Sequence, residues 1–165
     1  YGKSSRCELL ELLKEWKDTD FGWLMNKAAA RGDVKLLKES KEKGAVNYNI
    51  AMKFAAAKGH MNVVKILKEW GADDFVIAAQ KASRYGHIEI LKLFKEWGLT
   101  DYDNAILEAI SGDNIEILKL FREWGLALPN TVFHRYNRVP LSRALEIFII
   151  DWKASSPMNP LMLTI

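Results

Sequence analysis

The sequence predicts an all-α fold, an α-solenoid of stacked antiparallel helix pairs, from an internal repeat and the helical spacing within it. Trp70, Trp97 and Trp124 are 27 residues apart (97 − 70 = 27; 124 − 97 = 27), and such a period is typical of repeat arrays. We call residues separated by this period a column. Five further columns keep the period without an insertion: Gly44/Gly71/Gly98/Gly125, Gly32/Gly59/Gly86/Asp113, Asp20/Asn47/Asp74/Asp101, Phe21/Tyr48/Phe75/Tyr102 and Ala28/Ala55/Ala82/Ala109.

Each repeat is predicted to form two helices, A and B. An Asp or Asn opens the repeat, where its side-chain oxygen can cap the N–H groups of helix A. Helix A runs to the first glycine column and helix B from there to the Trp-Gly pair, because glycine readily ends helices. Asp113 suits its place in a glycine column, since Asp tolerates left-handed backbone. Ile88, Leu91 and Phe94 have helical spacing, and the alanine column lets neighbouring A helices approach closely.

These elements divide the chain into one array over 1–152 and an extended tail over 153–165. The array is expected to contain a half-repeat, four repeats and a degenerate C-terminal cap, over 5–19, 20–46, 47–73, 74–100, 101–127 and 128–152. The half-repeat has two interpretations: the array continues upstream in a longer parent chain, or the segment is a terminal cap. Tyr1 is not a start methionine, which favours the longer parent.

Composition excludes several classes of protein. The 165 residues are 49% hydrophobic and 27% charged, which excludes a disordered chain. The net charge of +3 is small for a nucleic-acid-binding protein, which argues against nucleic acid as a partner. No apolar run approaches about 18 residues, so no membrane span is expected. Cys7 is the single cysteine, which predicts an intracellular, reducing compartment.

Two segments resemble the second helix of ankyrin repeats, namely GHMNVVKILKEWGADD (59–74) and GHIEILKLFKEWGLTD (86–101). The first helix, AMKFAAAKGH (51–60), matches less well. The period of 27 is shorter than the ankyrin period of about 33, and the missing residues fall where ankyrins carry a β-hairpin. The chain is therefore similar to a short, hairpin-less ankyrin array. Its K-E-W-G-A-x-D-[FY] wording is similar to ankyrin-like arrays of giant DNA viruses of amoebae, which implies the cytoplasm of a host cell or a virion.

The sequence offers no catalytic pattern. Neither a Ser-His-Asp or Cys-His arrangement, nor a phosphate-binding glycine loop, nor an H-E-x-x-H motif is present. We therefore expect no enzyme, no cofactor and no metal site. His60 and His87 share a column with Asp33 and Asn114, which predicts hydrogen-bonding caps. The Trp column is expected to stack along the array, and a solvated B-helix face is expected to carry i,i+4 pairs, namely Lys65/Glu69, Lys92/Glu96 and Lys119/Glu123.

Columns of helix A that differ between repeats are the candidate binding positions, because the framework columns hold the stack. Trp, Tyr and Arg dominate the energies of protein interfaces. The predicted partner-binding residues are Trp23, Lys27, Phe54, Lys58, Lys81, Arg84 and Tyr85. The expected function is a non-catalytic interaction module that binds a host or viral protein on its concave helix face, with no small-molecule substrate.

Three alternatives remain at this point. Phe54 could instead pack between helices. The chain could be a structural component of a larger particle or assembly that contacts its neighbours through its ends and tail. It could also be an accessory domain of an enzyme whose catalytic part lies upstream.

Overall fold

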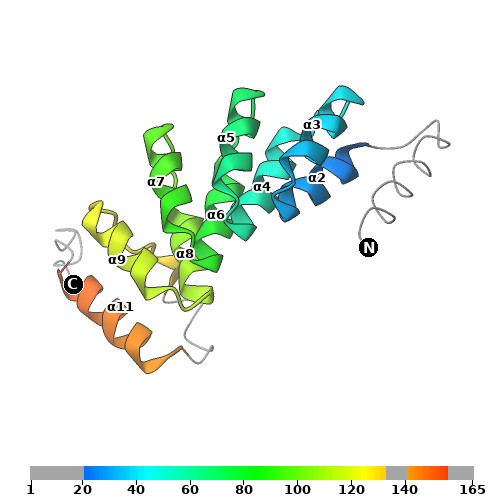
Figure 1. Cartoon of the computed structure of the whole chain (residues 1–165). Coiled ribbons are helices and arrows are strands. Elements are labelled where there is room, and N and C mark those ends of the chain that lie inside the picture. The colour runs from blue at the N-terminus through cyan, green and yellow to red at the C-terminus, as the bar shows by residue number, and fades with distance from the viewer. Residues whose placement is uncertain (1–20, 133–140, 156–165) are drawn as a thin grey trace.

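The computed structural model describes residues 21–132 and 141–155, and the regular structure of these residues is entirely α-helical, which confirms the predicted all-α fold (Figure 1). The helices are α2 (Phe21–Arg31), α3 (Val34–Glu42), α4 (Tyr48–Lys58), α5 (Met61–Glu69), α6 (Val76–Tyr85), α7 (Ile88–Glu96), α8 (Asp103–Ser111), α9 (Ile115–Glu123) and α11 (Arg143–Ser155). The expected half-repeat over 5–19, with Cys7, and the tail residues 156–165 lie outside the described residues. None of the described helices is long and apolar enough to cross a bilayer.

The first eight of these helices form four consecutive pairs with different surroundings for their two members. We call α2, α4, α6 and α8 the A helices, and α3, α5, α7 and α9 the B helices. Each A helix packs against the next A helix and against the B helix of its own pair. The A helices therefore form a continuous row, from which the B helices project like a fan (Figure 1).

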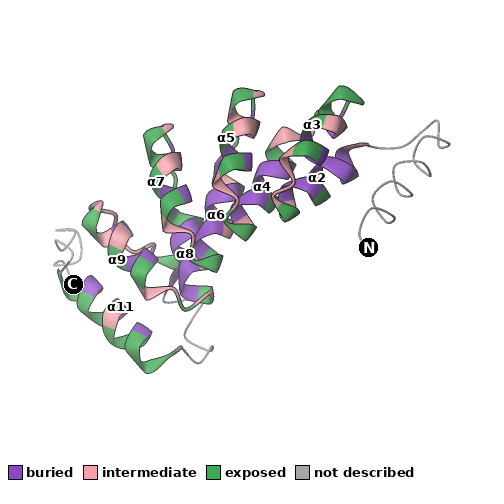
Figure 2. Cartoon of the chain, viewed as in Figure 1, coloured by how far each residue is buried: buried purple, intermediate pink, exposed green. Residues whose placement is uncertain are grey.

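Small side chains allow the A helices to lie in direct contact. Ala28, Ala55, Ala82 and Ala109 form one column, and each is completely buried. A methyl side chain lets helix axes approach more closely than a larger side chain does. The buried residues accordingly concentrate along the row of A helices, whereas the outer ends of α3, α5 and α7 are exposed (Figure 2).

The turns between A and B helices need left-handed backbone and little space. Gly59 has a φ of 78°, and Asp113 in the same column has a φ of 55°. A Cβ on Gly59 would lie only 2.8 Å from the ring of His87, which comes from the following repeat. Glycine at this position is thus required both by its backbone angle and by the neighbouring imidazole.

The His/Asn column connects repeats rather than capping its own helices. The Nε2 atoms of His60 and His87 donate hydrogen bonds to the carbonyl oxygens of Ala30 and Ala57, over 3.2 and 3.1 Å. Neither histidine makes a side-chain bond to the helix that it precedes. The prediction of a capping column was therefore wrong for both, and it holds for Asp33, whose carboxylate accepts a bond from the N–H of Leu36 at 2.9 Å.

The tryptophans pair within their own repeats. The ring centroids of Trp70, Trp97 and Trp124 lie 5.9, 5.4 and 5.6 Å from those of Tyr48, Phe75 and Tyr102 respectively. These edge-on and tilted contacts fill the space between the end of helix B and the start of helix A. The expected stacking of tryptophan on tryptophan does not occur among the described ring pairs.

A column of cations links each aromatic pair to the repeat before it. The Nζ atoms of Lys41 and Lys95 lie 4.3 Å from the ring centroids of Trp70 and Trp124, and that of Lys68 lies 4.6 Å from Phe75. Each of these cation–π contacts is worth about 0.5–1 kcal/mol at an exposed site. In the first described repeat Lys43 stands in the Trp column, with its Nζ 5.3 Å from the ring of Phe21.

Helix α11 follows the four pairs and contacts α9. Leu145, Ile149 and Trp152 are its buried side chains, and Arg122 of α9 pairs with Asp151 at 2.7 Å. The helix continues to Ser155, so the first residues of the segment expected to be an extended tail over 153–165 are helical instead.

Candidate binding face

One side of α2, α4 and α6 carries nine residues at equivalent places, which we call the A face. On each helix they are spaced four residues apart, so they point to the same side. On neighbouring helices they share columns, so they form a grid of three rows. The A face consists of Trp23, Lys27, Arg31, Ile50, Phe54, Lys58, Ile77, Lys81 and Tyr85.

Large apolar side chains on the A face are open to solvent. Trp23 is 48% exposed, Tyr85 58% and Phe54 37%, and Ile50 and Ile77 are exposed to a similar extent. A ring packed between helices would be buried, as the alanines on the opposite side of the same helices are. Phe54, the least exposed of the three rings, is only partly enclosed by its neighbours. Exposed apolar groups gathered on one face mark an interaction surface.

The three helices that carry the A face contain no acidic residue. Their sequences include six cations and neither Asp nor Glu, the cations being Lys27, Arg31, Lys53, Lys58, Lys81 and Arg84. The Nζ atoms of Lys27 and Lys53 lie 4.9 Å from the rings of Trp23 and Phe54 on their own helices.

Three of these cations are uncommitted. Arg31, Lys58 and Lys81 make neither an ion pair nor a ring contact with another described residue. Each is therefore available for a carboxylate that a partner brings.

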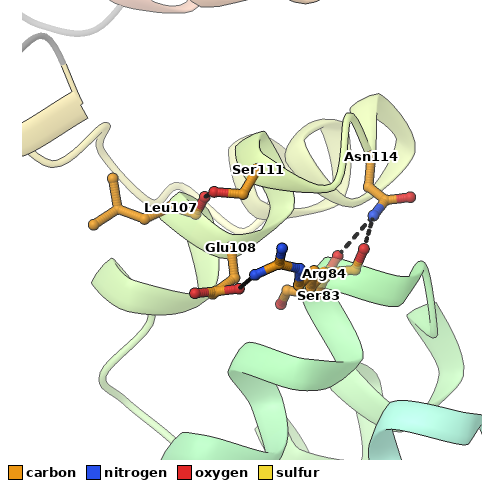
Figure 3. A network of polar contacts seen from close by, with 6 residues as sticks. All are labelled: Ser83, Arg84, Leu107, Glu108, Ser111 and Asn114. Carbon is orange, nitrogen blue, oxygen red and sulfur yellow. Dashed lines mark hydrogen bonds and ion pairs between the residues drawn. The ribbon is translucent and has the colours of Figure 1, made fainter. Parts of the chain in front are cut away.

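Arg84, which the sequence placed among the binding residues, is occupied within the fold. Its Nη1 pairs with Glu108 Oε2 of α8 at 3.2 Å. Its carbonyl oxygen and that of Ser83 accept hydrogen bonds from the side-chain amide of Asn114, the second over 3.0 Å (Figure 3). Arg84 thus couples α6 to α8, whereas the other six predicted residues lie on the A face.

The A face ends at α8. The residues of α8 and its following turn that continue the three rows are Asn104, Glu108 and Gly112, which supply neither an aromatic ring nor a cation. A Cβ on Gly112 would clash with the carbonyl oxygen of Arg84, so no side chain fits there. Asp103 and Glu108 also reverse the sign of the charge on this helix.

The B helices present a different surface. Glu89 and Glu116 pair with Lys92 and Lys119 at 2.8 and 2.7 Å, across three residues of the same helix. The expected i,i+4 partners, Glu96 and Glu123, are not used. Such exposed pairs are worth little individually.

Sequence reasoning missed three members of the A face, Arg31, Ile50 and Ile77, although each shares a column with a predicted binding residue. The signal that could have found them is the absence of acidic residues from three A helices in succession.

Neither metal-binding chemistry within the described ranges nor comparison with known proteins identifies another site. The described residues contain no cluster of three or more His, Cys, Asp or Glu side chains that could hold a metal ion. No protein-family model matches the chain, and no curated protein matches it.

Proposed function

We propose that the chain is a hairpin-less, ankyrin-like α-solenoid that acts as a non-catalytic protein–protein interaction module through its A face. The observation that carries this proposal is the grid of exposed aromatic, aliphatic and uncommitted basic side chains on α2, α4 and α6. Trp, Tyr and Arg supply most of the binding energy at protein interfaces, and the A face offers all three types.

The curvature of the row supports a concave binding surface. The A helices touch one another, whereas the B helices fan apart (Figure 1). In a stack of two layers, the layer with the smaller spacing lies on the inside of the curve. The A face then lines the inner surface, which repeat arrays use to bind extended partners.

The ankyrin-like sequence of the repeats extends this proposal to the location of the protein. It favours a viral protein that works in the cytoplasm of a host cell or in a virion and binds a host or viral protein. No small-molecule substrate is part of the proposal.

Site-specific photocrosslinking tests the location of the partner. A photoreactive phenylalanine analogue replaces Phe54 or Tyr85 on the A face, and Lys65 on α5 serves as the exposed control position. The protein is irradiated in extracts of the cells that produce it. We expect one protein to crosslink at Phe54 and Tyr85 and not at Lys65. Crosslinks to that protein only from the control position would contradict the proposal.

A second candidate function is a structural component of a larger assembly that contacts its neighbours through its ends. The observation that favours it is the pair of exposed isoleucines on α11, Ile147 and Ile150. A photoreactive residue at Ile150 separates the two functions, because the structural role predicts crosslinks there and none at Phe54.

A further inference from the structure

We propose that the segment bound by the A face is acidic and carries bulky apolar side chains. This inference rests on the proposed function and names the chemistry of the partner. Its carboxylates would pair with Arg31, Lys58 and Lys81, and its apolar groups would cover the exposed rings and isoleucines between them.

Charge complementarity supports the first half of the inference, that the bound segment is acidic. Three consecutive A helices lack acidic residues, whereas the described B helices α3, α5, α7 and α9 all mix both signs. The contrast lies on one face of a chain whose net charge is only +3. The positive charge of this face attracts an acidic segment and repels a basic one. The electrostatic field of the A face therefore favours partners that carry negative charge.

The spacing of residues on the A face supports the second half of the inference, that the partner segment also carries bulky apolar side chains. Each of the three helices places one aromatic residue a single turn from a cation: Trp23 with Lys27, Phe54 with Lys58, and Tyr85 with Lys81. Residues four apart on a helix have Cβ atoms about 6 Å apart. A segment in which acidic and apolar side chains are close neighbours matches this alternation. One that is acidic alone would leave the exposed apolar groups in water.

The same face fits nucleic acid less well. Nucleic-acid binding commonly neutralises about 6–10 phosphates, and the A face has three uncommitted cations. Ile50 and Ile77 occupy two positions of the first row, and aliphatic side chains offer no ring on which a base can stack. Glu108 and Asp103 of α8 adjoin the face and repel a phosphate backbone that continues along the row.

Selection from a library of random peptides tests the inference without a known partner. The probe is an mRNA-displayed library of short random peptides, selected on the intact protein at about 0.15 M salt. Parallel selection on a Phe54→Ala/Tyr85→Ala variant identifies the peptides that need the A face. We expect those peptides to be enriched in Asp and Glu together with aromatic or aliphatic residues. Peptides that need the A face but are neutral or basic would overturn the inference and leave the proposed function standing.

Charge reversal measures the electrostatic part. Lys58→Glu/Lys81→Glu reverses two uncommitted cations on the A face, and Lys38→Glu/Lys65→Glu reverses two exposed cations of the B helices as a matched control. For the best selected acidic peptide, we expect the first variant to raise Kd at least about tenfold and the control to change it less than about threefold. Equal effects of the two variants would overturn the inference. Circular dichroism checks that both variants keep the helical content of the parent.

A fluorescent oligouridylate provides the competing probe. We expect it to bind at least about tenfold more weakly than the best selected peptide at the same salt concentration. Comparable or tighter binding that Lys58→Glu/Lys81→Glu abolishes would assign the A face to nucleic acid and overturn the inference. If no library peptide depends on Phe54 and Tyr85, both the inference and the proposed function fail.

Discussion

The A and B helices of the repeats use the same residue types for different purposes. In the B helices, Lys41, Lys68 and Lys95 lie over aromatic rings of the next repeat. On the A face, Lys27 lies beside the exposed ring of Trp23 on its own helix, and the other three cations have no partner among the described residues. The difference teaches that the lysines of the B helices add contacts between consecutive repeats, whereas the A helices, which pack against one another in a row, leave one side available.

This difference also explains why the sequences of the B helices vary little between repeats. A B helix that lost its lysine would lose the contact to an aromatic ring of the next repeat. One that lost its buried phenylalanine would lose ring contacts within its own repeat. On the A face, Trp23, Ile50 and Ile77 replace one another in one column, because nothing in the fold packs against the whole side chain.

Truncation of a phenylalanine should give the largest difference between the two layers. Phe94 of α7 is completely buried and stacks on Phe75 at 5.6 Å, so Phe94→Ala should cost about 3–5 kcal/mol. Phe54→Ala on the A face should cost less than about 1 kcal/mol, because this ring is already partly in water. Urea unfolding followed by circular dichroism measures both free energies. Similar losses for the two variants would break the comparison.

The hydrogen bond between repeats should give the next effect. His87→Ala removes the bond from Nε2 to the carbonyl oxygen of Ala57 and should cost about 1–2 kcal/mol. His87→Asn should cost less, because Asn114 makes the equivalent bonds from the same column. The difference between the unfolding free energies of the two variants measures the contribution of the side-chain hydrogen bond between repeats. An asparagine variant no more stable than the alanine variant would refute this role of the column.

Removal of a single lysine charge sharpens the comparison further. Lys95→Met removes a cation 4.3 Å from the ring of Trp124 and should cost about 0.5–1 kcal/mol. Lys58→Met keeps a similar length of side chain on the A face and should change stability by less than about 0.5 kcal/mol. Thermal unfolding of both variants in the same buffer makes the measurement. A larger loss for Lys58→Met would mean that the A face has a structural role.

The smallest effect concerns a hydroxyl group. The Tyr102 hydroxyl is buried without a hydrogen-bond partner among the described residues, and burial raises the pKa of its phenol above 10.0. Phe75 holds the same column, so Tyr102→Phe should change stability at neutral pH by less than about 0.5 kcal/mol.

The raised pKa of Tyr102 also fixes the sign of a pH effect. The unfolded chain releases the phenolic proton at a lower pH than the folded chain, so folding favours the neutral form. This stabilisation is fully present below pH 10.0 and is lost as the pH rises through the folded-state pKa. Denaturant midpoints at rising alkaline pH should therefore fall less steeply for Tyr102→Phe than for the parent. Identical slopes would contradict the burial of the hydroxyl.

The sequence predicted the C-terminal ends of the helices well, because each has a chemical marker. The predicted N-cap column held less well, since the side chain of Asn47 makes no capping bond and α6 begins after Phe75 rather than after Asp74. The left-handed backbone at the glycines and Asp113 could be predicted from residue type. The alanine column could be predicted from the repeat period. The roles of His60 and His87 could not be predicted in the same way. Their partners lie in the preceding repeat, and only the stacking geometry brings them within reach.

The candidate site was predicted in part for a related reason. Three aromatic residues and three lysines on the variable columns gave six of its nine members. Arg84 was assigned to the site because arginine is one of the residue types that dominate interface energies. Its ion pair with Glu108 could not be predicted, because it depends on the contact between α6 and α8. The lysine column over the aromatic rings was missed because lysine is frequent throughout the B helices, and the sequence does not show which lysine faces a ring.

The most direct test of the central claim is a map of the bound surface. Isotope-labelled protein is titrated with the best peptide from the library selection, and backbone amide chemical shifts are followed by NMR. The account predicts that the largest changes fall on α2, α4 and α6, around Trp23, Phe54 and Tyr85. Changes centred on the B helices or on α11 would contradict it.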